Sequence, residues 1–396
     1  MPDRIYYTDA QCTGFEAAVV GVTRLDGRPA VALDTTAFYP LSGGQPCDTG
    51  TLGEARVLDV VESDAGEVWH VLDREIEAGR RLRGTIDWER RFDHMQQHTG
   101  QHILSAAFDR LSHARTVGFH LGAVVSTLDL SIDLSADAVA AAEADANRIV
   151  WEDRPVGIRF VSDTEAAALP LRKEPGRGGM LRVIDVEGYD MSACGGTHVS
   201  RTGSIGLIAV LSTERVRGGA RVEFVCGGRA LRALRTFGDA VDACIRHVSV
   251  APGELPAAIE RLQAENKEQR KAVKDLQERL AGYEAAALAS EAEEANGVRQ
   301  VVRALEGRDQ NALKAMALAI CGRPGFQAAL FTTTPPYMAV LARSKDARGD
   351  CAAALKALMA AFGGRGGGKP ELALGGGLTG DLSQILAAAR AALGRD

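Results

Sequence analysis

The stretch 254–296 constrains the fold of this chain more than any other part of the sequence. Apolar residues recur there every three or four positions, with Glu and Lys between them. They are Ile259, Leu262, Val273, Leu276, Leu280 and Tyr283. This spacing places them on one face and is typical of a long amphipathic helix or a short coiled coil. Pro252 and Gly253 mark a boundary before it, so we expect separate folded parts on its two sides.

The remaining sequence predicts an α+β fold with several domains. A chain of 396 residues is too long for one ordinary core, and two to four domains are expected. Residues 1–90 contain short strand-like runs between Gly, Pro and Asp turns, which predicts a small β-barrel or sandwich. From Arg90 the spacing becomes helical and then mixed. We therefore predict a β-barrel-like domain (1–90), an α+β domain (91–250), a helical linker (251–300) and a C-terminal α/β domain (301–396).

Charge gives two conflicting indications about a nucleic-acid partner. The net charge of -6 argues mildly against one, because Lys and Arg dominate phosphate binding. Two local stretches, 80–91 and 201–235, are nevertheless rich in arginine. They supply the candidate contacts Arg80, Arg81, Arg83, Arg215, Arg217 and Arg221. A solvated surface of mixed sign is the commoner explanation of such stretches.

Cysteine usage and hydropathy predict a soluble, cytoplasmic protein without a membrane partner. The seven cysteines are odd in number and dispersed, which fits a reducing compartment and not a disulfide framework. No run of about 18 apolar residues is present, and the polar start of the chain has no signal-peptide core.

Two residue pairs predict a metal site. His98 and His102 are four positions apart, so on a helix both imidazoles project from the same face. Alone, this pair is weak, because two such histidines are more often ordinary helix residues. Cys194 and His198 repeat the spacing, and the two glycines between them favour a tight turn after a strand. Three histidines and one cysteine form a suitable tetrahedral ligand set for Zn²⁺, and we predict one zinc ion per chain.

The role of this zinc stays open on the ligands alone. A structural zinc normally has four protein ligands, whereas a catalytic zinc keeps one position open. The ion therefore either activates water or positions a substrate. No Ser-His-Asp or paired-carboxylate arrangement is evident, and no catalytic residue beyond the metal site is assigned.

Three segments resemble a known family. RFDHMQQHTGQHILSAAF (91–108), CGGTHVSRTG (194–203) and FYPLSGGQPCDTG (38–50) are similar to the editing domain of alanyl-tRNA synthetase and to its free-standing relatives, the AlaX proteins. The C-terminal GGRGGGKPELALGGG (363–377) resembles the signature of the DHHA1 domain that ends those synthetases. The resemblance implies that 91–250 is a zinc-binding editing domain and 301–396 a DHHA1-like domain. Because the chain starts at the β-rich module, we expect the long free-standing form.

The resemblance also implies a reaction, a partner and further site residues. The reaction is hydrolysis of the ester of mischarged tRNA(Ala) at the acceptor end, chiefly Ser-tRNA(Ala) and secondly Gly-tRNA(Ala). Thr36 matches the position that recognises the serine hydroxyl, and Thr35 is the neighbouring alternative. Without the resemblance, either threonine would be explained as an ordinary strand residue that binds no ligand. Gly43, Gly44 and Gln45 match a glycine-rich motif near the active site, and the resemblance implies that they also take part in substrate recognition.

The sequence around this motif departs from the free-standing members. Leu41 and Ser42 precede the glycines, which is closer to the synthetase version and bears on fine specificity. Lys369 joins the arginines as a candidate tRNA contact. A homodimer through the 254–296 helix or the C-terminal domain is a further expectation.

Two other functions are compatible with parts of the sequence. A zinc-stabilised tRNA-binding protein without catalysis would use the same four ligands and the same arginines. A DHH-type phosphoesterase would share the C-terminal domain, but it needs an Asp-His-His motif that this sequence lacks.

Overall fold

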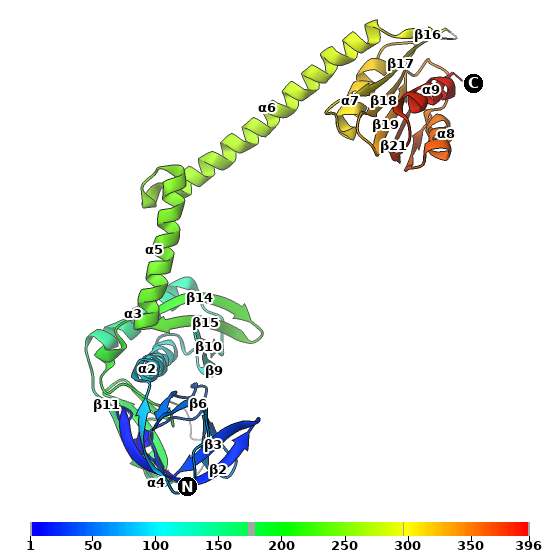
Figure 1. Ribbon diagram of the computed structural model, residues 1–396. Helices are drawn as coiled ribbons and strands as arrows, with labels where there is room; N and C mark the ends of the chain where they lie inside the picture. Colours follow the sequence, from blue (N-terminus) through cyan, green and yellow to red (C-terminus); the bar gives the residue numbers. More distant parts are fainter. Residues whose placement is uncertain (1, 173–178, 296, 395–396) are drawn as a thin grey trace. The chain divides into compact units, whose positions relative to one another are not determined.

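The computed structural model describes residues 2–172, 179–295 and 297–394. The chain divides into two compact units, Met1–Cys244 and Ile245–Asp396. The boundary between them falls inside helix α5 (Gly228–Val248). Each unit is described by itself, and Figure 1 gives the element labels.

The first unit begins with a closed six-stranded barrel (Figure 1, blue). Its strands, in spatial order, are β2 (Gly14–Leu25), β3 (Arg28–Leu33), β7 (Val68–Leu72), β6 (Ala55–Glu62), β5 (Gly50–Leu52) and β8 (Arg81–Ile86). Neighbouring strands are antiparallel, and alternate residues of β2, such as Phe15, Ala17 and Val19, are buried in the interior, as the pleat requires. Closure leaves the barrel without free edges. Ahead of it, β1 (Asp3–Arg4) pairs with β4 (Thr35–Thr36), followed by helix α1 (Ile5–Thr8).

Helix α2 (Trp88–Ser112) forms the centre of the first unit. It starts at Asp87, whose side chain accepts a hydrogen bond from the Arg90 backbone N–H, and every residue from 94 to 108 is buried. Gly100 allows the close packing, because a Cβ atom there would lie 2.3 Å from Cys226 Sγ. The cost of glycine within a helix is thus offset by contact with the neighbouring sheet.

Two antiparallel sheets and a second helix surround α2. The first sheet has the order β14 (Ile208–Val216), β15 (Gly219–Cys226), β10 (Ser126–Leu130) and β9 (Thr116–Leu121). The second sheet has the order β11 (Val156–Val161), β12 (Leu181–Val186) and β13 (Asp190–Ala193). Between β10 and β11 the chain forms α3 (Ala136–Trp151), and the connections contain α4 (Asp163–Ala167) and the 3₁₀ turn η1 (Thr202–Ile205). The apolar core of α2, α3 and the first sheet is continuous.

A buried ion pair fixes the start of α2 to the barrel. Arg91 and Asp48 are both 0% exposed, and Arg91 Nε lies 3.0 Å from each carboxylate oxygen of Asp48. Arg91 also donates to the Ala10 carbonyl at 2.7 Å, and Asp48 accepts the Tyr39 N–H at 2.6 Å. The charges are paired and hydrogen-bonded, which is the condition for burying them. The position of α2 is therefore set by contacts with the barrel and the N-terminal segment.

The second unit is a three-layer α/β structure. After η2 (Pro252–Glu254), the long helix α6 (Leu255–Ser290) precedes a six-stranded sheet. The sheet order is β16 (Glu293–Ala295), β17 (Val298–Leu305), β18 (Phe326–Thr332), β19 (Tyr337–Arg343), β21 (Leu372–Leu378) and β20 (Arg365–Lys369). The end of α6 and α7 (Gln310–Cys321) pack on one face, while α8 (Cys351–Phe362) and α9 (Leu382–Leu393) pack on the other.

Several predictions from the sequence can be compared with these elements. A mixture of barrel, sheets and helices is present, as the α+β prediction requires. The predicted linker 251–300 includes β16 and the start of β17, because α6 ends at Ser290. The glycine-rich stretch 363–377 forms the paired strands β20 and β21. Across the described ranges, no helix has the length and apolar character needed to span a membrane.

Candidate metal centre

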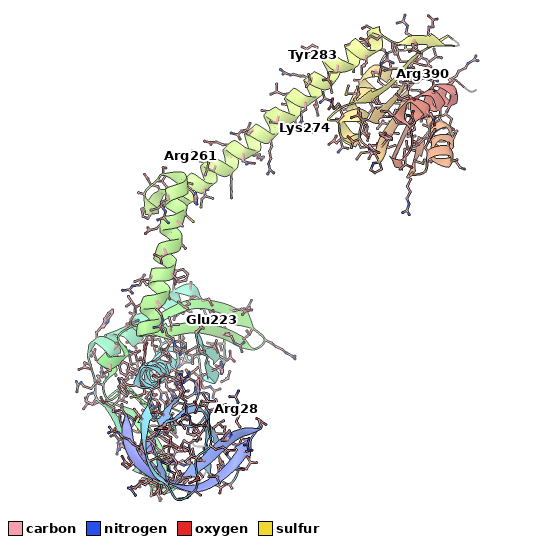
Figure 2. The ribbon with its side chains drawn as sticks, in the orientation of Figure 1. Arg28, Glu223, Arg261, Lys274, Tyr283 and Arg390 are labelled. Atoms are coloured by element: carbon pink, nitrogen blue, oxygen red, sulfur yellow. The ribbon has the colours of Figure 1, made fainter. Side chains whose placement is uncertain are left out.

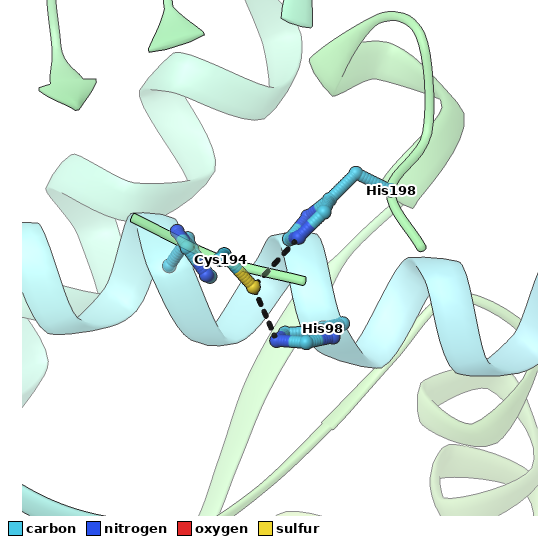
Figure 3. A group of neighbouring side chains, drawn as sticks. His98, Cys194 and His198 are labelled. Carbon is cyan, nitrogen blue, oxygen red and sulfur yellow. Dashed lines mark hydrogen bonds between the residues drawn. The ribbon is translucent and has the colours of Figure 1, made fainter. Parts of the chain in front are cut away.

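Four side chains from two distant parts of the chain converge beside α2. One nitrogen each from His98, His102 and His198 and the sulfur of Cys194 all lie within 4.8 Å of one another. Figure 3 shows Cys194 between His98 and His198, with its sulfur 3.4 Å from the Nε2 atom of each. The three imidazoles are at most 4% exposed, whereas Cys194 is half-buried. The predicted metal ligands are therefore brought together.

The 194–198 segment is a tight turn that places its two ligands over α2. It follows β13, and the Cys194 N–H donates to the Arg182 carbonyl at 3.0 Å. Gly196 packs directly on the imidazole of His98, because a Cβ atom there would lie 2.1 Å from His98 Cε1. Any larger residue at 196 would displace this ring, so glycine is required for the cluster to close.

Each histidine of the cluster is held through its outer nitrogen. His98 Nδ1 lies 2.8 Å from Gln45 Oε1, and His102 Nδ1 lies 3.3 Å from Asp190 Oδ2. His198 Nδ1 lies 3.2 Å from the Thr99 hydroxyl, which itself donates to the Met95 carbonyl. These partners accept, so each Nδ1 carries the proton.

The tautomer that this pattern selects suits a metal ligand. With Nδ1 protonated, the Nε2 lone pairs are directed to the middle of the cluster. Such outer hydrogen bonds orient metal-binding histidines and increase their basicity. This feature distinguishes a built metal site from histidines that are merely close together.

The charges of the cluster also favour a cation. Burial raises the pKa of the Cys194 thiol, but its electrostatic interactions and hydrogen bonds with the three neighbouring imidazoles outweigh burial, so the pKa lies well below its usual value. Burial lowers the pKa of His198 to about 3. For His102, burial is outweighed by hydrogen bonds to Asp190 and Cys194, which raise the pKa to about 9. A metal ion held by these four residues would take the place of a proton, since metals bind thiolate and neutral imidazole.

Gln45 joins the barrel side of the site to the metal ligands. It is fully buried; its Oε1 also accepts the Thr197 N–H at 3.1 Å, and its Nε2 donates to the Thr197 hydroxyl at 2.8 Å. This amide thus contacts His98 and the 194–198 turn, and its predicted contact with substrate stays a prediction. Its position makes it a support for the metal cluster.

The two glycines before Gln45 have conformations that suit glycine. Gly43 and Gly44 have φ values of 55° and 79°, a region that other residues rarely adopt. Gly44 also lies against β9, where its carbonyl accepts the Leu121 N–H at 3.0 Å and a Cβ atom would lie 3.0 Å from the Phe119 ring. Gly44 thus allows close packing of the loop on the first sheet, and contact of Gly43 and Gly44 with substrate stays a prediction.

Thr36 lies inside the barrel. It is 0% exposed, its hydroxyl is 2.8 Å from His70 Nε2, and it accepts the Phe38 N–H at 3.1 Å. His70 Nδ1 is 3.1 Å from the Val31 carbonyl, so the hydroxyl donates to His70. Thr35 points to the other side of the strand, and its hydroxyl donates to the Asp3 carbonyl. In this conformation the Thr36 hydroxyl is not open to a ligand, and its role in serine recognition stays a prediction.

The predicted tRNA contacts are all exposed but not all free. Arg80, Arg81 and Arg83 lie on or beside β8, and Lys369 ends β20. Arg221 forms a two-pronged ion pair with Asp129 at 2.7 and 2.9 Å. The other two candidate arginines of the second stretch are Arg215, which pairs with Asp133 at 3.0 Å, and Arg217 in the β14–β15 turn.

Sequence reasoning missed three residues around the metal ligands. They are Asp190, Thr99 and Arg182, and of these Thr99 and Arg182 have no distinctive spacing to either ligand pair. Arg182 is 8% exposed and donates to the carbonyls of Cys194 and Gly196 at 2.6 and 2.9 Å. Only the position of Asp190 at the start of β13, four residues before Cys194, gave a usable signal.

Comparisons with known proteins agree with this geometry. The family model described as "Threonyl and Alanyl tRNA synthetase second additional domain" matches residues 181–221, which include Cys194 and His198. The alanine–tRNA ligase of Methanoculleus marisnigri is 35% identical over 393 residues, covering 94% of this chain and 41% of that protein. The alanyl-tRNA editing protein AlaX-L of Pyrococcus horikoshii is 34% identical over 276 residues, covering 66% of each.

One solved structure also matches. The C-Ala domain from Aquifex aeolicus alanyl-tRNA synthetase is 17% identical, with a TM-score of 0.25, over 26% of this chain and 98% of that one. A likeness this small carries no argument about the fold.

The match over residues 181–221 identifies in this segment the second additional domain of threonyl- and alanyl-tRNA synthetases. Among proteins with this domain, the chain belongs to the AlaX-type alanyl-tRNA editing family, which is related to the alanyl-tRNA synthetases. The chain spans about two fifths of the length of the synthetase relatives and 66% of the AlaX-L protein.

Proposed function

We propose that this protein is a zinc-dependent deacylase that hydrolyses the ester of mischarged tRNA(Ala). The observation that carries the proposal is the cluster of one thiolate and three imidazoles, in which each imidazole is fixed through Nδ1. The donor set of one sulfur and three nitrogens suits Zn²⁺. Membership of the editing family supports tRNA(Ala) as the partner and its acceptor end as the point of attack.

The residues of this chain hold and orient the reacting groups. Zinc bound by His98, His102, Cys194 and His198 supplies a positive charge for positioning or for activating water. Cys194 is the half-buried member of the cluster, so the substrate reaches the site from its side. Gln45, Asp190 and Thr99 keep the ligands in place, and Arg182 holds the turn through its carbonyls.

Serine is the proposed amino acid, with glycine second. Aminoacyl esters are intrinsically labile, so precise placement near a charge supplies much of the required acceleration. A site that bonds a substrate hydroxyl rejects analogues without one. Thr36 is the proposed discriminator and requires the barrel side chains around it to move. The arginines of 80–83, those of 215–221 and Lys369 are the proposed contacts with the RNA backbone.

We further propose that α6 joins two copies of the chain. The six apolar residues of the predicted stripe lie in two rows, 259–266–273–280 and 262–269–276–283, which are the a and d positions of a heptad repeat. The apolar members are 43–77% exposed, and Figure 2 shows Arg261, Lys274 and Tyr283 projecting from the helix. Asn266 and Gln269 occupy the central layers, where polar residues specify the register of a coiled coil.

Release of labelled serine tests the proposed function. We expect rapid loss of serine from Ser-tRNA(Ala), but not from Ser-tRNA(Ser) and not of alanine from Ala-tRNA(Ala). A chelator should stop the reaction and zinc should restore it. If one zinc is bound per chain but no aminoacyl-tRNA is deacylated, the protein is a zinc-stabilised RNA-binding protein instead.

A further inference from the structure

A second hollow lies beside the first turns of α2. Its volume is about 610 Å³, and its walls include Trp88, Phe92, His94 and, from α5, Arg232. None of the four metal ligands lines it. His94 precedes His98 by one helical turn, a rise of about 6 Å along α2. The hollow has the size of a small-molecule site and neighbours the metal cluster along the helix.

One wall of the hollow presents an aromatic face. The rings of Trp88 and Phe92, one turn apart, are stacked with centroids 5.4 Å apart and planes 27° apart. Phe92 packs against the core, whereas Trp88 is 38% exposed. A supported indole with a free face is a stacking platform for a nucleobase, and such stacking tolerates any base.

A polar group in the wall lacks a partner. His94 is 2% exposed, yet its Nδ1 has no hydrogen-bond partner among the residues that the structure describes. Buried polar groups normally have one. Burial lowers the pKa of His94 to about 4, so the imidazole that lines the hollow is neutral. This chemistry suits the edge of a base better than an anion.

The opposite side of the hollow suits a phosphate. Helix α5 begins there at Gly228, and the side chain of Arg232 is 66% exposed. Arg229 pairs with Asp93 at 2.9 and 3.0 Å, so this carboxylate is neutralised. Of the other acidic groups in the wall, Asp87 caps α2 and Glu89 is exposed. Arg232 lies 3.9 Å from Asp93 but is largely exposed, and the N–H groups at a helix start together with an exposed arginine bind phosphate.

We propose that this hollow binds one unpaired nucleotide of the RNA strand whose 3′ end reaches the metal site. Its base stacks on Trp88, its edge meets His94, and its phosphate lies at the start of α5 near Arg232. The identification of this RNA as tRNA(Ala) rests on the proposed function, whereas the binding of a nucleotide in the hollow does not. The pocket would add affinity next to the ester without touching the reacting atoms.

Binding of an unacylated trinucleotide, CCA, to the zinc-loaded full chain tests this pocket. Calorimetry should show that Trp88→Ala and Arg232→Ala each weaken binding about tenfold, as expected for one stacking or phosphate contact. Trp151→Ala is the matched control, since Trp151 is 71% exposed on α3, and it should bind like the unaltered chain. All three variants should keep their zinc.

The outcomes separate this inference from the proposed function. Equal binding by Trp88→Ala, Arg232→Ala and the control would overturn the pocket. If Trp88→Ala loses zinc or unfolds, Arg232→Ala decides alone, because its exposed side chain can be removed without disturbing the core. Because CCA carries no ester, the loss of binding would be seen even in a protein without deacylase activity.

Discussion

Helices α2 and α6 use polar and apolar residues in opposite ways. In α2 every residue from 94 to 108 is buried, although the segment contains three histidines and three glutamines. In α6 the apolar residues at heptad positions are exposed, and only Ala258, Ala285 and Ala289 are buried. Most buried polar groups of α2 are hydrogen-bonded within the chain, with His94 Nδ1 and Gln101 Oε1 as exceptions, whereas the large apolar side chains of α6 remain exposed.

The difference indicates where each helix has its interaction partners. Polar residues buried in α2 are tolerated because contacts such as His98 with Gln45 and His102 with Asp190 satisfy them, which is the condition for burying polar groups. They therefore mark an internal site. An apolar stripe left open on α6 indicates instead an external partner, and a second copy of the same helix fits its heptad spacing.

Removing a metal ligand should give the largest effect on the α2 side of this comparison. Cys194→Ala leaves three ligands, so zinc content should fall from one per chain to nearly none, and serine release should slow by at least ~100-fold. Elemental analysis and the deacylation assay measure the two effects. Cys244→Ala, at an exposed position on α5, is the control and should change neither.

Breaking the buried ion pair between Arg91 and Asp48 should have the next largest effect, a loss of stability. Asp48→Asn leaves the Arg91 guanidinium buried without a counter-charge and should lower the free energy of unfolding of the first unit by ~3–5 kcal/mol. Urea denaturation followed by circular dichroism would show this. Glu75→Gln removes an exposed partner of Arg24 and should cost less than ~1 kcal/mol. Equal effects would mean that the barrel does not position α2.

Asp190 provides a finer test of the outer hydrogen bonds. Asp190→Asn keeps the shape but removes the charge beside His102, and zinc affinity should fall ~10–100-fold. Competition with a chromophoric chelator measures it. Asp185→Asn, which changes a surface pair with Arg159 on the neighbouring strand, should leave the affinity unchanged. An unchanged affinity in Asp190→Asn would show that the carboxylate is only a structural neighbour.

For α6 we predict that a substitution in the apolar stripe changes the oligomeric state of the protein but not its zinc content. Leu276→Lys places a charge in the apolar stripe and should convert a dimer to a monomer in sedimentation velocity. Gln277→Lys, at the adjacent position outside both heptad rows, should not. Zinc content should be the same in both. A dimer that survives Leu276→Lys would point to the C-terminal domain as the interface.

The sequence predicted those parts of the site that depend on local spacing. His98 with His102 and Cys194 with His198 could be paired because a helix and a turn bring residues four apart together. The residues that contact their Nδ1 atoms could not be predicted in this way, because Gln45 is 53 positions from His98 and Asp190 is 88 positions from His102. The barrel and the long helix could be predicted from the periodicity of apolar residues. Strand β5 could not, because it lies in a stretch rich in glycine and proline.

The most direct test of the metal centre is X-ray absorption at the zinc edge, combined with zinc analysis of the purified chain. We predict one zinc per chain with one sulfur at ~2.3 Å and three nitrogens at ~2.0–2.1 Å, and loss of the sulfur signal in Cys194→Ala. A chain that binds no zinc, or a spectrum without sulfur in the unaltered protein, would contradict the assignment of these four residues as its ligands.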